Sequence, residues 1–297
     1  MVLQKKKVLV YGAGSLGSYL ATKLYAAGHD VDVVGRQKAK DIGKYLYINE
    51  EKFDFPKVYD DLDSSKKYDY IFVTSKYYNL RSNLETIVNS GVRPGLIILI
   101  QNTYLDNSWY IQVIKNIPFV VASVYEGFNI NKNKLTCKSY AGWFFEEDAF
   151  GKEVCNLLKD AGLQARLVDD LDVKRAEKTV INCASNIICA LEQKTIKEAN
   201  KNKENMKIAQ GLFDESYDVL SEIIPMHSKR SLWTFFLQNV KDLDHYASTC
   251  QDVMRNKRTE LSYLNGYIIE LGRKMGIATP VTLDTVNRFR KKYHDLY

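Results

Sequence analysis

Residues 8–21 read "VLVYGAGSLGSYLA", a short apolar run that ends in glycines and resumes with helical spacing. The pattern predicts a buried strand, a turn and a helix. The order Gly12-x-Gly14-x-x-Gly17 suits a dinucleotide: Gly12 allows a tight turn, Gly14 a close approach of the pyrophosphate, and Gly17 packing of the helix on the strand. A plain strand–helix turn is the alternative, but the elements on both sides favour a dinucleotide site. Its predicted residues are Gly12, Ala13, Gly14, Ser15, Leu16 and Gly17.

The end of the second predicted strand indicates which dinucleotide is bound. NAD-binding domains usually place an acidic residue there for the ribose 2′-hydroxyl, whereas this chain has Arg36 in "VDVVGR". A guanidinium matches a 2′-phosphate in charge and geometry. Asp32 lies four residues earlier, and we interpret it as a solvated strand position. The sequence therefore predicts NADPH/NADP+ as cofactor, with an ordinary surface role as the alternative for Arg36.

Two halves of the chain differ in their hydrophobic period. From residue 7 to about 168, apolar runs such as "KVLVYG", "DVDVVG", "YDYIFVTS", "LIILIQN" and "PFVVASV" alternate with helical patterns. Beyond "LVDDLD" only helical patterns follow, with breaks near Pro225, Gly276 and Pro280. We predict an α/β N-terminal Rossmann-type doubly wound parallel sheet and an all-α C-terminal domain. The expected domains are residues 1–168 (NADP-binding) and 169–297 (helical, substrate and catalytic).

Composition excludes several classes of function. The net charge of +6 is spread along all 297 residues, which argues against a nucleic-acid surface. Five cysteines without a C-x-x-C pair are typical of a reduced, cytoplasmic protein, and four scattered histidines offer no metal-ligand spacing. The longest apolar run, residues 96–100, is far shorter than the ~20 residues of a membrane span. We expect no metal, nucleic-acid partner or membrane segment. A homodimer is compatible with the sequence, which does not specify an oligomeric state.

Further polar residues stand where a ligand would meet them. Lys76 and Asn102 end two predicted strands, at the sheet edge where open α/β proteins bind ligands. Lys178, Asn182 and Asn186 recur at i, i+4 and i+8 in a predicted helix, opposite its apolar face. A solvated face is the alternative, but asparagine is a poor helix former. Two asparagines in one stripe favour contacts with an oxygen-rich ligand.

The stretch "ASTCQDVMRNKRTELSYLNGY" (residues 247–267) completes a resemblance to the ketopantoate reductases (2-dehydropantoate 2-reductases). The matching pieces run in family order over nearly the whole chain. They are "GAGSLG", Arg36, "VTSK" with Lys76, "QN" with Asn102, "KTVINCASN", and "S…QD…RTE…YLNG" with Ser248 and Glu260. The resemblance implies NADPH-dependent reduction of ketopantoate to pantoate, a step toward pantothenate and coenzyme A.

The resemblance also implies roles for single residues. Lys178 would be the general acid, with Glu260 closing the site beside substrate and cofactor. Asn182, Asn186 and Ser248 would hold the substrate. Four further residues would contact the cofactor: Lys76, Asn102, Gly127 in "VYEGF" and Glu260. Asn102 would also contact the substrate. From the residues alone, Ser248 or Thr249 with Asp252 could instead form a helix-capping box, and Glu260 could be an exposed helix residue.

The chain departs from the family pattern on the substrate side. Thr103 follows Asn102 where the family usually has glycine, and "NIICAL" stands where "NPLTAL" is usual. A further asparagine found in some members is replaced in the "LEQKTIKEA" region. These changes leave three hypotheses: a ketopantoate reductase, a paralogue that reduces another branched 2-oxo acid, or a non-catalytic NADPH sensor. The Lys178 and Glu260 pair argues against a sensor, which needs no proton donor.

Overall fold

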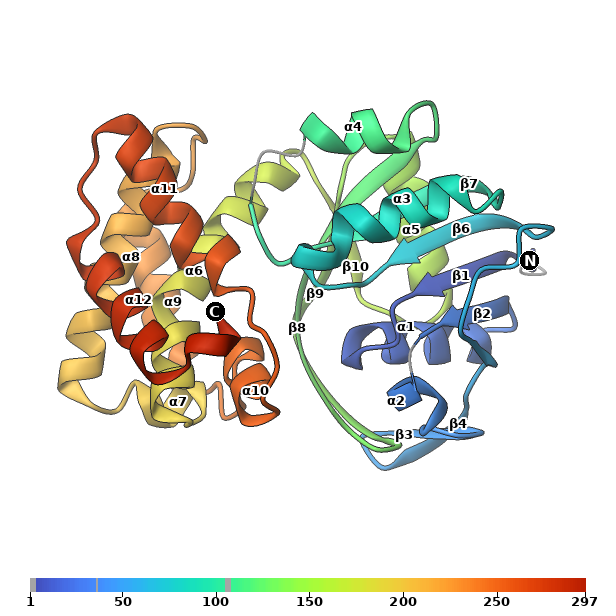
Figure 1. Ribbon diagram of the computed structural model, residues 1–297, viewed down its shortest axis with the longest axis horizontal. Coiled ribbons are helices and arrows are strands. Elements are labelled where there is room, and N and C mark those ends of the chain that lie inside the picture. The colour runs from blue at the N-terminus through green and yellow to red at the C-terminus, as the bar shows by residue number, and fades with distance from the viewer. Residues whose placement is uncertain (1–3, 36, 105–107) are drawn as a thin grey trace. The chain divides into compact units, whose positions relative to one another are not determined.

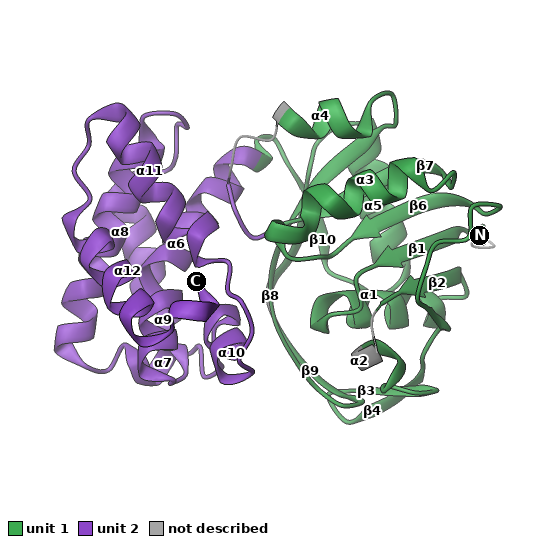
Figure 2. Ribbon diagram, in the orientation of Figure 1, with its two compact units in different colours: residues 1–101, 106–171 green, residues 102–105, 172–297 purple. Residues whose placement is uncertain are grey.

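The chain separates into two compact units. A computed structural model describes residues 4–35, 37–104 and 108–297. Unit 1 comprises residues 1–101 and 106–171, and unit 2 comprises residues 102–105 and 172–297 (Figure 2). The expected domain boundary followed residue 168. By compactness, residues 102–105 group with the helices and residues 169–171 with the sheet.

Unit 1 is built on one sheet, which contains ten strands within the described residues (Figure 1). The strands are β1 Lys7–Tyr11, β2 Asp30–Val34, β3 Tyr45–Ile48, β4 Glu51–Asp54, β5 Val58–Tyr59, β6 Lys67–Val73, β7 Arg93–Ile100, β8 Phe119–Asn131, β9 Lys134–Glu146 and β10 Ala165–Val168. Their order is β4-β3-β9-β8-β7-β6-β1-β2-β5, with β10 beside β9.

The central strands run parallel, and the order reverses beside β1. β1 pairs with β2 on one side and with β6 on the other, and β7 and β8 continue in parallel. The crevice next to β1 is therefore the switch point at which such sheets bind ligands. β8 is longer than the predicted "PFVVASV", because its polar second half forms an antiparallel arm with β9. The sequence prediction relied on apolar runs and therefore missed the polar second half of β8.

Helices cover both faces of the sheet, as a doubly wound fold requires. Leu20 and Leu24 pack on one face beside Val154 and Leu158, whereas Leu80 and Ile114 belong to the core on the other face. The helices of unit 1 are α1 Ser15–Ala26, α2 Gln37–Lys40, α3 Leu80–Asn89, α4 Ser108–Ile114 and α5 Ala149–Asp160, with the 3₁₀ turn η1 Tyr77–Asn79. Alternation of strand and helix in the sequence thus produces the predicted Rossmann-type sheet.

Unit 2 is helical throughout its described residues (Figure 1). Its helices are α6 Leu171–Glu192, α7 Ile196–Ala199, α8 Lys203–Ser221, α9 Lys229–Val240, α10 Ser248–Met254, α11 Asn265–Met275 and α12 Pro280–Lys292, with 3₁₀ turns η2 Leu261–Tyr263 and η3 His294–Leu296. α6 is the central element, since Val180, Ala184 and Ile187 are fully buried in the core of this unit. The predicted order, an α/β domain followed by an all-α domain, is confirmed.

Candidate functional site

The glycine-rich loop connects β1 to α1 through a tight, closely packed turn. Gly12 has φ +114°, which side-chain-bearing residues rarely adopt, and its N–H donates to the Val34 carbonyl at 3.0 Å. A Cβ on Gly17 would lie 1.9 Å from the Gly12 carbonyl oxygen. Thr74, at the end of β6, donates from Oγ1 to that same carbonyl at 2.5 Å. The first and third glycines are therefore required by the protein's own packing.

Gly14 differs, because the space beside it is open. A Cβ built on Gly14 would meet nothing within 4 Å, and its φ of −75° suits any residue. Gly14 is the N-cap of α1 and makes no side-chain capping hydrogen bond. The N–H groups of the first helical turn, with the partial positive charge of the helix end, are the donors that phosphate oxygens require. The loop fits the pyrophosphate of a dinucleotide.

The end of β2 is packed against this loop. A Cβ on Gly35 would lie 2.8 Å from the Cβ of Ala13, so the two segments touch. Arg36, the predicted 2′-phosphate ligand, lies outside the described residues. The interpretation of Asp32 as a solvated residue is wrong. Asp32 is buried, forms a 2.8 Å ion pair with Lys66 and accepts a hydrogen bond from the hydroxyl of Tyr68.

Two more predicted cofactor residues lie in unit 1. Lys76 follows β6 and occupies the N-cap position of η1, where its carbonyl accepts from the N–H of Asn79 at 3.0 Å. Gly127 lies in the antiparallel arm of β8, opposite Lys138 and just beyond an irregularity at Tyr125 and Glu126. Lys76 therefore stands at the carboxyl edge of the central sheet, and Gly127 stands on the arm.

Unit 2 brings together Lys178, Asn102 and Glu260. Lys178 projects from the second turn of α6, and its Nζ donates to Oδ1 of Asn102 at 2.9 Å. Glu260 immediately precedes η2 and is only 5% exposed, with its charge acting on Lys178. A cation, an amide and a carboxylate that are far apart in the sequence thus form one cluster.

The surroundings of Lys178 alter its proton affinity. Burial lowers the pKa of Lys178 to about 8, the negative charge of Glu260 opposes this change, and the positive charge of Arg175 adds to it. The ammonium form is therefore present at neutral pH but releases its proton more readily than a solvated lysine. A group with these properties is suited to general acid catalysis near neutrality.

Arg175 and Thr179, which the sequence analysis did not single out, hold the segment after β7. Nη2 of Arg175 donates to the carbonyl of Thr103 at 3.1 Å, and the N–H of Tyr104 donates to Oγ1 of Thr179 at 3.0 Å. Both partners on the segment are backbone groups. Every residue type has them, so the sequence could not indicate these contacts. These contacts explain why residues 102–105 belong to the helical unit.

The other predicted substrate residues also lie in unit 2. Asn182 is half-buried, and Asn186 is buried next to Ser185, whose hydroxyl lies 3.4 Å from the Asn186 Oδ1. Ser248 is exposed and is the first residue of α10. The capping-box alternative is wrong, because Ala247 is the N-cap of α10 and makes no side-chain capping hydrogen bond. The alternative of an exposed Glu260 is wrong as well, since Glu260 is buried.

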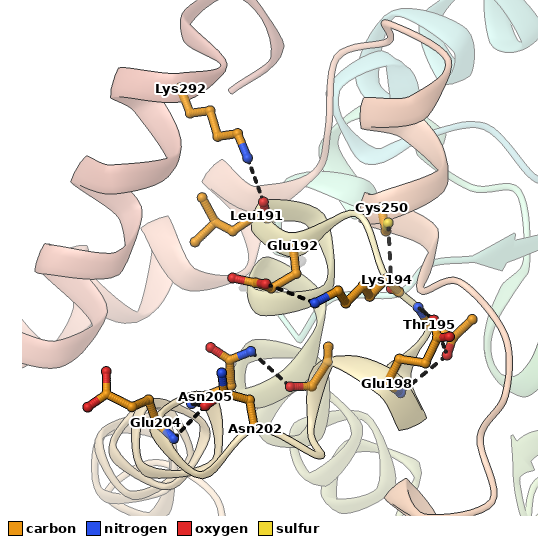
Figure 3. Close-up of polar contacts among 11 residues, drawn as sticks. Leu191, Glu192, Lys194, Thr195, Glu198, Asn202, Glu204, Asn205, Cys250 and Lys292 are labelled. Atoms are coloured by element: carbon orange, nitrogen blue, oxygen red, sulfur yellow. Dashed lines mark hydrogen bonds and ion pairs between the residues drawn. The ribbon is translucent and has the colours of Figure 1, made fainter.

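The "LEQKTIKEA" region forms the C-terminal end of α6 and the short helix α7 (Figure 3). Thr195 and Glu198 form a capping box at the start of α7, and Lys194 makes a 3.5 Å ion pair with Glu192. Nζ of Lys292 donates to the carbonyl of Leu191 at 2.7 Å, near the C-terminal end of α6. Residues at which some ketopantoate reductases place an asparagine thus have structural partners here.

The described ranges contain neither a membrane-spanning helix nor a candidate metal site. In residues 4–35, 37–104 and 108–297, no helix combines the length and the apolar character needed to cross a bilayer. Over the same ranges, no group of three or more histidine, cysteine, aspartate or glutamate side chains is arranged to hold a metal ion.

Comparisons with known proteins agree on one family. The model of the family "Ketopantoate reductase PanE/ApbA" matches residues 8–136, and that of its C-terminal domain matches residues 170–292. The 2-dehydropantoate 2-reductase of Archaeoglobus fulgidus is 25% identical over 97% of this chain and 98% of its own length. The first match covers the glycine-rich loop, and the second covers Lys178 and Glu260.

Solved structures share the fold of the chain. A D-mandelate dehydrogenase in a ternary complex with NADH and anilino(oxo)acetate superimposes with a TM-score of 0.86 at 19% identity, covering 98% of this chain and 99% of that one. A dimeric ketopantoate reductase from Staphylococcus aureus gives a TM-score of 0.81 at 18% identity, covering 98% and 99%. At these identities the likeness concerns the fold alone.

Proposed function

Because the chain belongs to the ketopantoate reductase family and is an NAD(P)-dependent oxidoreductase, we propose that it reduces 2-dehydropantoate (ketopantoate) to (R)-pantoate with NADPH. The observation that carries the proposal is the cluster of Lys178, Asn102 and Glu260. The product is an intermediate on the way to pantothenate and coenzyme A, so the proposal places the protein in the cytoplasm. Its assembly as a homodimer is part of the proposal, with the dimeric reductase of S. aureus as precedent.

Lys178 supplies the proton of the reaction. A bound NADPH supplies hydride to the C2 carbonyl carbon of the 2-oxo acid. The carbonyl oxygen gains negative charge as its π bond breaks, and the Lys178 ammonium gives a proton to that oxygen. The product is a 2-hydroxy acid, and Lys178 is left neutral until it takes a proton from water. A lysine with a pKa of about 8 makes this transfer easier than an ordinary lysine would.

The remaining residues of unit 2 position the substrate. Asn102 accepts from Lys178 through Oδ1, and in this proposal its Nδ2 group donates to the substrate. Asn182 and Asn186 follow Lys178 along α6 and offer amide groups to the carboxylate and hydroxyl of the substrate. Ser248 supports the same role from α10. Glu260 orients Lys178 or a substrate hydroxyl through its negative charge.

Unit 1 holds the cofactor in this proposal. The loop from Gly12 to Gly17 would hold the phosphates, since the space beside Gly14 is open. Arg36 accounts for the choice of NADPH over NADH, and Lys76 and Gly127 contribute further contacts. Asp32 does not compete as a ribose ligand, because Lys66 and Tyr68 already bind its carboxylate.

A second candidate is the reduction of a different branched 2-oxo acid. The observation that favours it is Thr103, which is 1% exposed and adjoins Asn102 where the family usually has glycine. A larger residue next to Asn102 changes the space available to a substrate side chain. This candidate keeps the chemistry of Lys178 and differs only in the substituent on the 2-oxo acid.

The test is the oxidation of NADPH, followed by its absorbance, with ketopantoate and a panel of branched and aromatic 2-oxo acids. We expect ketopantoate to have the highest kcat/KM. A clear preference for another branched 2-oxo acid would support the second candidate, and a preference for an aromatic 2-oxo acid would contradict both. Absence of turnover with the whole panel, in protein that binds NADPH, would refute both. Lys178→Ala is the matched control, since it removes the proton donor but leaves the glycine-rich loop unchanged.

A further inference from the structure

One turn of α6 holds the residues that follow β7 by three side chains. Lys178 binds the Asn102 side chain, Arg175 binds the Thr103 carbonyl, and Thr179 accepts from the Tyr104 N–H, at 2.9, 3.1 and 3.0 Å. We propose that Arg175, supported by Thr179, is a positioning residue that fixes residues 102–104 on α6 and so directs Oδ1 of Asn102 at the Lys178 ammonium. This inference rests on the proposed function, in which Lys178 donates the proton.

Arg175 is itself held in a single arrangement. Its side chain is buried, Nη1 forms a 2.7 Å ion pair with Asp172, and the guanidinium lies 5.6 Å from the ring centre of Tyr104. The planar fork thus binds a carboxylate with one arm and a backbone carbonyl with the other, which a lysine cannot reproduce. The ion pair with Asp172 on the same helix therefore anchors Arg175 independently of the segment that it holds.

Thr179 connects the two contacts. Its hydroxyl donates to the carbonyl of Arg175 at 2.9 Å and accepts from the N–H of Tyr104. Two successive residues, Thr103 and Tyr104, are consequently tied to α6 by their backbones, immediately after Asn102. A backbone fixed at two adjacent points leaves the Asn102 side chain few orientations, which is how a supporting shell fixes a functional group.

The charge of Arg175 has a second effect on Lys178. Glu260 attracts the ammonium and Arg175 repels it, and both charges act on Lys178 beside the amide of Asn102. Removing the positive charge at position 175 therefore favours the protonated lysine. This effect depends on charge alone, so Arg175→Lys, which keeps the charge, separates it from the positioning of Asn102.

The experiment compares Arg175→Met, Arg175→Lys and Thr179→Val with Lys174→Met as the matched control. Lys174 neighbours Arg175 on α6 but pairs with Glu177 at 3.7 Å. We expect Arg175→Met to lower kcat/KM by up to about 10²-fold, as a small displacement of a catalytic group does. We also expect the pH at which activity is lost to shift upward. Arg175→Lys keeps the charge, so it should lower kcat/KM without this shift.

A double-variant cycle tests whether Arg175 acts through Asn102. In an Asn102→Ala background, Arg175→Met should lower kcat/KM little further, because the side chain that Arg175 positions has already been removed. If the double variant loses kcat/KM by the product of the two single-variant factors, the proposal is overturned. It is also overturned if Arg175→Met has the same kcat/KM and pH profile as Lys174→Met. Melting curves identify variants that fail to fold, and Arg175→Lys serves as the milder substitution at that position.

A readout without turnover separates this inference from the proposed function. The rate at which acetic anhydride acylates Lys178, measured by mass spectrometry across pH, reports the fraction of neutral amine. Its midpoint should rise in Arg175→Met and stay unchanged in Lys174→Met. If no 2-oxo acid is reduced but the midpoint shifts, the proposed function fails while the influence of Arg175 on Lys178 stands. If turnover is normal and the midpoint does not shift, the inference about Arg175 fails alone.

Discussion

At the scale of single residues, the proposed chemistry depends on Lys178 having an acidic proton. Replacement by alanine removes an interaction that strengthens as the carbonyl oxygen becomes negative, so kcat should fall more than substrate binding weakens. General acid catalysis contributes typically 10²–10⁴-fold, and we expect Lys178→Ala to lose about that much kcat. Steady-state kinetics measures the loss, and NADPH fluorescence should show unchanged cofactor binding. Near-normal turnover would assign the proton to another group.

The same residue predicts the pH dependence of the enzyme. The acid form of Lys178 is active, and its pKa is lowered to about 8 by burial, so kcat/KM should be constant below that pH and fall as pH rises through it. An ordinary lysine would keep its proton to a pH near 10. A pH profile of kcat/KM with buffers of constant ionic strength tests this. A decline only near pH 10 would contradict the effect of burial.

Arg36 carries the prediction on cofactor choice. The unmodified protein should prefer NADPH strongly, and Arg36→Ala should raise KM for NADPH with little change for NADH, since the guanidinium is proposed to bind only the 2′-phosphate. Parallel kinetics with both cofactors measures the difference. Equal use of NADPH and NADH by the unmodified protein would remove Arg36 from the cofactor site.

Residues found by sequence reasoning share one property: their type was unusual for its position. Gly14 in the turn after a strand and two asparagines on a helix face indicate a ligand, because packing does not require these residue types at those positions. Arg175 and Thr179 are ordinary helix residues in sequence. Their partners are backbone atoms 72 and 75 residues away, so only the folded chain reveals them. Asp32 was misread because its partners, Lys66 and Tyr68, come from a later strand and the loop before it.

At the scale of elements, the glycine-rich loop separates packing from binding. Gly17→Ala would bring a Cβ to 1.9 Å from the Gly12 carbonyl, so this variant should unfold at a lower temperature. A Cβ on Gly14 meets no atom within 4 Å, so we expect Gly14→Val to fold normally and to place its side chain in the space proposed for the pyrophosphate. We expect its Kd for NADPH to rise by about tenfold or more, the equivalent of about 1.4 kcal/mol.

Melting curves and NADPH titration of both glycine variants provide the measurement. Normal NADPH affinity in folded Gly14→Val would show that the phosphates do not lie beside Gly14. Gly14→Ala is the milder companion, and we expect it to weaken binding less because its side chain is smaller.

The elements themselves were predictable to different degrees. Strands β1, β6 and β7 each contain a run of buried apolar residues, and β2 is buried from Val31 to Val34 although Asp32 interrupts its apolar residues. The β3–β4 hairpin and the β8–β9 arm are partly exposed and mix polar with apolar residues, so periodicity gives no clear signal. α6 was predictable as a helix, because its buried apolar positions repeat at helical spacing over 22 residues.

At the scale of the whole molecule, two compact units have separate hydrophobic cores. The proposed function assigns NADPH to unit 1 and the proton donor to unit 2. Asn102 belongs to unit 2 although it follows a strand of unit 1 in the sequence, and Lys178 of α6 binds its side chain. A ligand that binds one unit should stabilise that unit first.

This division predicts how NADPH affects unfolding. A ligand at 100 times its Kd stabilises the state that binds it by about 2.7 kcal/mol. Scanning calorimetry with and without NADPH should therefore show an upward shift of the transition that belongs to unit 1, in the unmodified protein and in Lys178→Ala alike. Gly14→Val should show a smaller shift at the same concentration, because a tenfold higher Kd reduces the stabilisation to about 1.4 kcal/mol.

Core variants assign the transitions. Leu24 and Leu212 are fully buried, one in each unit, and replacement of such a leucine by alanine costs about 2–5 kcal/mol. Leu24→Ala should lower the transition that NADPH raises, whereas Leu212→Ala should lower the other. If NADPH instead raises the transition that Leu212→Ala lowers and leaves the first unchanged, the cofactor binds the helical unit. The glycine-rich loop would then be a strand–helix turn without a ligand.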